Sequence, residues 1–265
     1  NLENRIQELD LMRGIAVLLM IFDHLMYNLW GLMPLVFRDY PAEGLSLKIA
    51  RTALYYWRMD LRTGIRFIVL AVFMLLTGIC CSLSRSNLRR GLRLMGFALL
   101  VTAATFVVGL VTDYPDITIA FGVLHCIALA LICVGLADKL GVSKWIYLAL
   151  GLVMVTAGAI LFSDAEFISY SEGNAAVTVL RSVLGTASCG SDCFPFLLFG
   201  GQVFVGVFVG RQFYTERRSV FGARYENGLV TFVGRNSLAV YIIHQMILPV
   251  LIGLILLACG FHLAM

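Results

Sequence analysis

Three of the four histidines stand within long apolar stretches of the 265-residue chain, where an ionisable side chain calls for an explanation. They are His24, His125 and His244. Histidine suits general-base catalysis because its ordinary pKa lies near neutrality, and its ring can also act as a nucleophile. Ionisable groups in a membrane span are costly unless they are paired or hydrated. These histidines are therefore the first candidates for chemistry.

The stretch around His24 also holds three charged residues. Arg13 and His24 are eleven positions apart, so in a helix they share a face and are separated by about 16 Å along its axis. Asp10 precedes Arg13 by three positions and can pair with it. Asp23 is expected to point about 100° away from His24. We predict a catalytic site that includes Asp10, Arg13, Asp23 and His24. The alternative is that His24 is only a hydrogen-bonded packing residue.

A polar helix face is predicted near the C-terminus, around His244. Its members are Asn236, Ser237, Tyr241, His244 and Gln245. Such a face in a membrane helix must turn toward other helices or water. We predict His244 as a further catalytic residue, and Asn236 and Gln245 as substrate-binding residues. Nothing in the sequence shows whether the three histidines meet. No metal is predicted, because the sequence has no zinc-ligand spacing and the three histidines are on separate predicted helices. Phosphate-binding glycine loops and nucleophile elbows are missing as well.

Two groups of arginines are further candidates for binding. Arg62 and Arg66 are four positions apart and share a helix face, so we predict that they bind substrate. A basic mouth would suit an anionic substrate, while contact with lipid headgroups is the alternative. The second group is Arg85, Arg89, Arg90 and Arg93. It is either a charge cluster that sets membrane topology or a clamp for the phosphates of a nucleotide-containing cofactor, since arginine binds phosphate bidentately.

These residues must be positioned by membrane helices. Of the 265 residues, 60% are hydrophobic and 14% are charged, with a mean hydropathy of +0.90, whereas soluble domains are about 25% charged. Apolar stretches of about 20 residues are long enough to cross a bilayer. We predict an all-α integral membrane protein with about seven transmembrane helices. The predicted spans are 11–36, 63–83, 92–112, 117–137, 144–162, 194–211 and 236–261. Residues 37–62 and 163–193 are predicted as the longer loops, with a short interfacial helix at 174–186.

The orientation follows from the distribution of basic residues. With a cytoplasmic N-terminus, thirteen Lys and Arg residues lie on the inner side and seven on the outer side, as the positive-inside rule favours. These scattered charges predict topology rather than a nucleic-acid surface. We expect the first span to act as an uncleaved signal-anchor. Cys189 and Cys193, in CGSDC, either form a disulfide or remain free thiols.

Five motifs resemble, in order, those of bacterial members of the heparan-alpha-glucosaminide N-acetyltransferase family. They are ELDLMRGIAVLLMIFDH, TGICCSLSRSNLRRGLRL, FGVLHCIAL, DCFPFLLFGGQVFVGVFVGR and GRNSLAVYIIHQ. The opening motif, an Arg followed by a His, is also similar to that of membrane acyltransferase-3 proteins.

The resemblance implies transfer of an acetyl group from cytosolic acetyl-CoA to an amine or hydroxyl of a sugar or glycan on the far side of the membrane. Arg13 and His24 match the opening motif, and His244 and Gln245 match the last one. Ser84, Arg85 and the arginines that follow match the segment after the second span, which implies that they bind acetyl-CoA. The animal enzyme has Asn at the position of His24 and places its catalytic His in the next outer loop. Here no His occurs between residues 25 and 124.

We therefore expect one transmembrane acyltransferase domain over residues 1–265, in the bacterial inner membrane, with acetyl-CoA as donor, a glycan as acceptor and no nucleic acid as partner. The oligomeric state, including a homo-oligomer, stays open. One alternative is a transporter or exporter of a small anionic metabolite that uses the same Arg and His residues, although no repeated half is present. A non-catalytic acyl-CoA sensor is another.

Overall fold

A computed structural model describes residues 6–111, 113, 115–169, 174–188, 192–215, 219 and 228–264. The fold is all-α, as predicted. Extended structure within the described residues is limited to β1 (Glu166–Phe167) and β2 (Ala187–Ser188), which pair in parallel, and to a bridge between Phe37 and Leu263. The chain divides into two units. Unit 1 comprises Asn1–Phe73 and Phe221–Met265, and unit 2 comprises Met74–Val220.

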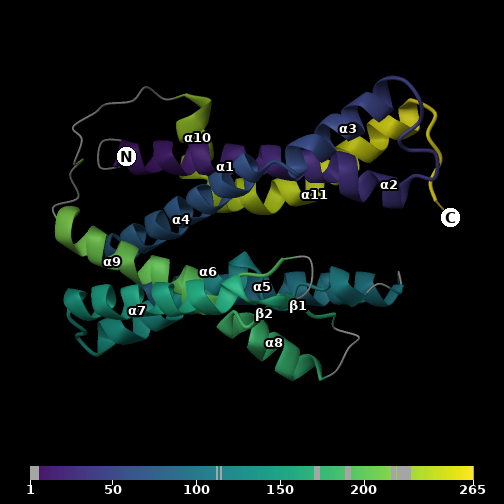
Figure 1. The fold of residues 1–265 in the computed structure, drawn as a ribbon. Helices are drawn as coiled ribbons and strands as arrows, with labels where there is room; N and C mark the ends of the chain where they lie inside the picture. The colour runs from purple at the N-terminus through teal and green to yellow at the C-terminus, as the bar shows by residue number, and fades with distance from the viewer. Residues whose placement is uncertain are drawn as a thin grey trace. The chain divides into compact units, whose positions relative to one another are not determined.

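Unit 1 is built around the first helix, which lies next to helices from the C-terminal end (Figure 1). Its elements are α1 (Gln7–Tyr27), a π-helical stretch (Asn28–Leu32), α2 (Met33–Val36), α3 (Leu45–Trp57), the first part of α4 (Asp60–Ser82), α10 (Leu229–Arg235) and α11 (Ser237–Ala258). Both α10 and α11 pack against α1. The first helix therefore receives its neighbours from a segment about 200 residues later in the chain, by the numbering of those helices.

Glycines allow α10 to approach α1 closely. A Cβ atom at Gly14 would overlap the backbone carbonyl of Val230, and one at Gly234 would overlap the carbonyl of Asp10. Membrane helices associate through such small residues because lipid provides little hydrophobic drive between helices. At the other end of the unit, the C-terminal tail is fixed to the chain after α2 by Arg38 N–H to His262 C=O at 3.0 Å.

Unit 2 contains the remaining helices. They are the last part of α4, α5 (Asn87–Val111), a 3-10 turn (Pro115–Ile117), α6 (Val123–Lys139), α7 (Lys144–Ser163), α8 (Ala175–Leu184), a π-helical stretch (Phe196–Gly200) and α9 (Gly201–Phe213). α5 packs along α6, and α7 packs along α9. The core of α6 is buried on most sides, since ten of its residues are buried, which fits its apolar sequence.

Within the residues that the structure describes, six helical segments are long and apolar enough to cross a membrane. They correspond to six of the seven predicted spans. The seventh prediction, 117–137, corresponds to α6, which has 17 residues, begins at Val123 and is too short to be counted with the others. The predicted total of seven and the cytoplasmic N-terminus therefore stay predictions. The helix begins late because Gly122 is extended and its N–H is bound by the ring of His125 at 3.3 Å.

The predicted loops contain more structure than expected. Residues 37–62 were predicted as a loop, which is wrong for α3, a 13-residue helix that buries Ala50 and Ala53. Only one side of α3 is apolar, and a search for uniformly apolar spans does not detect such an amphipathic helix. The helix predicted at 174–186 is present as α8; its interfacial position stays a prediction. Cys189 lies outside the described residues, so the structure does not decide the disulfide prediction.

Candidate active site

His24 and His244 meet within unit 1. His24 lies in the last two turns of α1, and His244 lies eight residues into α11. Nδ1 of His24 is 2.9 Å from Nε2 of His244, and the two rings stack with centroids 5.1 Å apart. His244 is buried and His24 is partly buried. The contact joins residues 220 positions apart, which is why the sequence alone could not show it.

The hydrogen bonds of this pair assign the proton on each ring. Nδ1 of His244 is 3.1 Å from the backbone carbonyl of Val240, and a carbonyl only accepts, so this Nδ1 carries a hydrogen. In neutral His244, Nε2 is then an acceptor, and Nδ1 of His24 is the donor to it. Neutral His24 therefore has its lone pair on Nε2. No described residue forms a hydrogen bond with this atom.

Asp23 lies beside His24 and holds Arg62. The guanidinium contacts both carboxylate oxygens, at 2.7 and 2.6 Å, and it stacks on the ring of Trp57 at 3.6 Å. Tyr56 donates its hydroxyl to Asp23 at 3.2 Å. Burial, followed by the nearby Asp23 charge, raises the pKa of Tyr56, so the phenol stays protonated and can donate. Both members of the ion pair are largely buried, and such bidentate pairs fix geometry strongly.

Arg66 differs from Arg62 in having no such partner. It lies one turn further along α4 and is exposed in the chain. Among the described residues, no carboxylate lies within ion-pair distance of it. Of the two arginines predicted to bind substrate, Arg66 is thus the one with an open guanidinium.

Among the described residues, the other ones predicted from α1 and α11 form no hydrogen bond or ion pair with the histidine pair. Arg13 and Asp10 form the predicted i,i+3 pair at 3.8 Å. By helix geometry, Arg13 is about 16 Å and Asp10 about 21 Å along α1 from His24. Asn236 precedes α11 and donates to the carbonyl of Phe232 at 3.0 Å. Gln245 is exposed, next to His244 in sequence. The structure therefore brings together His24, His244, Asp23 and Arg62, and it does not bring Arg13 or Asp10 to them.

His125 has a different environment, within unit 2. It is 4% exposed. Its Nδ1 accepts from the N–H of Gly122 at 3.3 Å, and its Nε2 is 3.1 Å from the hydroxyl of Thr102. The Thr102 hydroxyl in turn reaches the carbonyl of Ile119 at 2.7 Å. Both ring nitrogens are used, so this histidine caps α6 and links it to α5.

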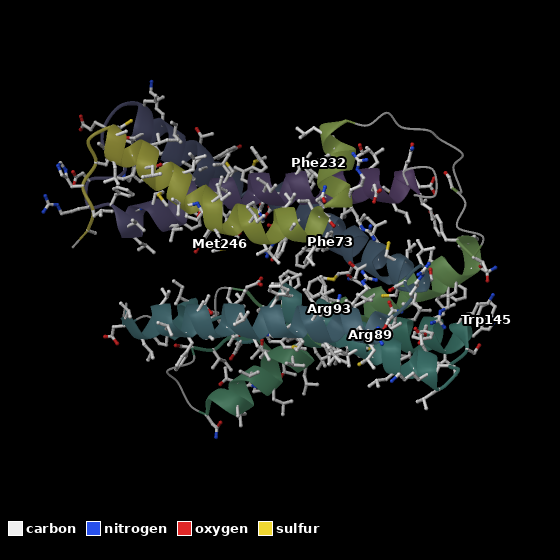
Figure 2. All side chains as sticks on the ribbon, turned by 180° about the vertical axis from the view of Figure 1, so that it is seen from behind. Phe73, Arg89, Arg93, Trp145, Phe232 and Met246 are labelled. Atoms are coloured by element: carbon white, nitrogen blue, oxygen red, sulfur yellow. The ribbon has the colours of Figure 1, made fainter. Side chains whose placement is uncertain are left out.

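The arginine cluster follows the turn between α4 and α5, in unit 2. Ser84 lies in that turn, and its hydroxyl accepts from the N–H of Ser86 at 3.4 Å. All four guanidinium-bearing residues of the cluster are exposed, and Figure 2 labels Arg89 and Arg93, one turn apart on α5. In the described part of the chain, none of the four forms an ion pair. Positive charges beside a helix N-terminus attract anions.

Sequence reasoning did not identify several residues around these sites. Tyr56 and Trp57 were placed in a loop, although they surround Arg62. Two adjacent aromatic residues, five and six positions before Arg62, were the available signal. Within the described residues, no group of His, Cys, Asp and Glu could hold a metal ion.

Comparison with known proteins gives the family. A model of the family described as "Heparan-alpha-glucosaminide N-acetyltransferase, catalytic" matches residues 44–246, well over half of the chain. The matched region includes the arginine cluster and His244 and begins after His24. Searches of curated proteins and of solved structures each gave no match. The chain belongs to the heparan-alpha-glucosaminide N-acetyltransferase catalytic family and is an integral membrane acetyltransferase of this type.

Proposed function

We propose that the chain transfers an acetyl group from cytosolic acetyl-CoA to an amine or hydroxyl of a sugar or glycan on the far side of the membrane, with Nε2 of His24 as the base. One contact above all supports this role: the hydrogen bond from Nδ1 of His24 to His244, which leaves the lone pair of His24 on Nε2. A general base must present a free lone pair at a fixed position.

The proposed step balances as follows. The acceptor nitrogen or oxygen attacks the carbonyl carbon of the thioester while Nε2 of His24 takes the acceptor's proton. The carbon–sulfur bond breaks, the acetyl group is bonded to the acceptor, and the CoA thiolate takes the proton from His24. Throughout, Nδ1 of His24 continues to donate to His244, so the pair keeps its geometry as the charge of His24 changes.

The remaining charged residues receive roles from their partners. Asp23 is held by Arg62 and Tyr56, so we assign this group to the positioning of the α1 segment that carries His24. We assign the open guanidinium of Arg66 to binding of the acceptor, together with Asn236 and Gln245. We assign the Asp10–Arg13 pair to stabilising the first turns of α1.

We assign binding of the donor, acetyl-CoA, to the arginine cluster. Proteins bind phosphate groups with arginines and with helix N-termini, and this cluster supplies both without internal ion pairs among the described residues. We assign the CoA phosphates to Arg85, Arg89, Arg90 and Arg93, with Ser84 in the adjoining turn.

This reaction also needs an orientation, with the N-terminus and the arginine cluster on the cytoplasmic side. Single cysteines, introduced into a variant without the native ones and labelled with an impermeant maleimide, test it. Residues at 84–93 should stay unlabelled in intact cells, and residues at 163–193 should react. Labelling of 84–93 from outside would contradict the orientation.

The function itself is tested with purified protein, acetyl-labelled CoA and glycan fragments from the cell envelope. We expect CoA release that depends on the acceptor, together with a labelled glycan. Binding of acetyl-CoA without CoA release would instead indicate a sensor. Uptake of an anionic metabolite into proteoliposomes without thioester cleavage would indicate a transporter. Either result would contradict the proposal.

A further inference from the structure

The ends of four helices in unit 2 meet at the carboxylate of Asp138, near the end of α6, and a fifth helix, α4, is joined to them through Asn87. Asn87, the first residue of α5, donates to it at 3.1 Å and also to the carbonyl of Cys81, in the last turn of α4, at 3.0 Å. Tyr147, in the first turn of α7, donates its hydroxyl to it at 3.1 Å. Arg211, near the end of α9, forms an ion pair with it. Asn87 and Tyr147 are almost fully buried.

Backbone packing fixes the same place. A Cβ atom at Gly135, one turn before Asp138, would overlap the backbone nitrogen of Leu88. A Cβ atom at Gly91 would lie 2.8 Å from the nitrogen of Ile132. The first turns of α5 and the last turns of α6 are therefore in backbone contact, so we expect a change at Asp138 to shift the start of α5.

The start of α5 is where the arginine cluster stands. Asn87 lies between Arg85 and Arg89 in sequence, and Arg90 and Arg93 follow within two turns. A helix end held at Asn87 fixes the direction from which these side chains leave the backbone. Accurate placement matters because binding weakens when charged groups must be reorganised to meet a ligand.

The charge of Asp138 is itself neutralised. Arg211 pairs with it, stacks over the ring of Tyr147 at 4.6 Å and donates to the carbonyl of Val142 at 3.4 Å. The negative charge of Asp138 is therefore balanced by the guanidinium of Arg211, from another helix. The carboxylate of Asp138 is then not available to pair with an arginine of the cluster in competition with phosphate.

We propose that Asp138, with Asn87 and Arg211, is the positioning group of the acetyl-CoA site: it fixes the first turn of α5 and keeps the cluster arginines unpaired. This role rests on the proposed function of the cluster as the phosphate clamp. Asp138 does not touch the reacting atoms, so it should affect binding of the donor and leave the transfer step unchanged.

The test separates KM from kcat. Asp138→Ala should raise the KM for acetyl-CoA about ten-fold, as expected when about one charge-assisted contact is lost. At saturating acetyl-CoA, kcat should stay within about two-fold of wild type. Asp138→Asn, which keeps the shape and an acceptor for Tyr147, should recover part of the loss. If Asp138→Ala does not fold, Tyr147→Phe and Asn87→Ala carry the same comparison.

A double variant tests the charge argument. Arg211→Gln leaves Asp138 without its cation, so the carboxylate is free to pair with a cluster arginine, and KM should rise. Adding Asp138→Asn removes that competing charge and should lower KM again. A merely structural network would show additive or larger losses in the double variant, and that result would overturn the charge argument.

Thr102→Val provides a matched control on the same helix. It removes hydrogen bonds to His125 and to Ile119, fifteen positions from Asn87, and should lower thermal stability without changing KM. If Arg89→Ala or Arg90→Ala raises KM but neither Asp138→Ala nor Asn87→Ala does, the positioning role is wrong. If no arginine variant changes KM, the clamp is wrong, and the positioning role falls with it.

Discussion

His24 in unit 1 and His125 in unit 2 are both histidines of apolar helices, yet their rings are used differently. Both nitrogens of His125 are bound, one by the N–H of Gly122 and one by the hydroxyl of Thr102. Only Nδ1 of His24 is bound, by His244, and Nε2 has no hydrogen-bond partner among the described residues. A fully bound ring stabilises a fold, whereas a ring held at one nitrogen is oriented and still open at the other.

The comparison shows that burial alone is a poor guide to chemistry. His125 is the more buried of the two and the better satisfied. What distinguishes His24 is a partner that fixes its proton on Nδ1, in the way that the third member of a catalytic triad fixes its histidine. The two sites therefore predict opposite consequences for the same substitution.

The largest expected effect is that alanine substitution lowers kcat at His24 and lowers thermal stability at His125. His24→Ala should lower kcat by about 10²–10⁴, the usual contribution of a general base, while thermal stability and acetyl-CoA binding change little. His125→Ala should do the reverse, with a lower melting temperature and near-normal kcat for the folded fraction, because buried partners lose their hydrogen bonds. Equal losses of kcat in both variants would remove the distinction.

The next effect concerns the arginine cluster. Like Nε2 of His24, its guanidinium groups have no ion-pair or hydrogen-bond partner among the described residues. Single Ala substitutions of Arg85, Arg89, Arg90 and Arg93 should raise the KM for acetyl-CoA about ten- to a hundred-fold for at least one of them, the effect of about 1.5–3 kcal/mol per charged contact. Initial rates at varied acetyl-CoA measure this. If all four variants keep the wild-type KM for acetyl-CoA, the cluster serves only as charges that set the membrane topology.

A smaller effect is expected at His244, which orients the reactive ring without touching the acceptor. His244→Ala removes one neutral hydrogen bond, so we expect kcat to fall about two- to ten-fold, as about 0.5–1.5 kcal/mol implies. Single-turnover rates measure it, and Met246→Ala, at an exposed position two residues further along, is the control for general disturbance of α11. A loss at His244 as large as that at His24 would mean that both rings act on the proton.

Much of the fold could be predicted from apolar runs and helical spacing. Six candidate spans lie where the sequence placed them. The start of α6 was missed because it depends on one hydrogen bond, from Gly122 to the ring of His125, which hydropathy does not register. α3 was missed because only one side of it is apolar, including the buried Ala50 and Ala53.

The candidate site was predictable in its members more than in its contacts. Asp10 and Arg13 pair as their spacing indicates, because both lie in one helix turn. The contacts of His24 with His244 and of Asp23 with Arg62 join different helices, and helical periodicity carries no information about which helices pack together. Single-sequence reasoning could therefore nominate these residues but could not pair them.

Turnover by His24→Asn tests the central claim, that Nε2 of His24 is the reactive atom, most directly. The side-chain amide of Asn can place a donor close to where Nδ1 stands, so the hydrogen bond to His244 survives, while nothing replaces Nε2 and the amide takes no proton at neutral pH. We predict that acetyl transfer falls by about 10²–10⁴, with acetyl-CoA binding and melting temperature close to wild type. Near-normal turnover would show that His24 is a positioning residue and that the chemistry lies elsewhere.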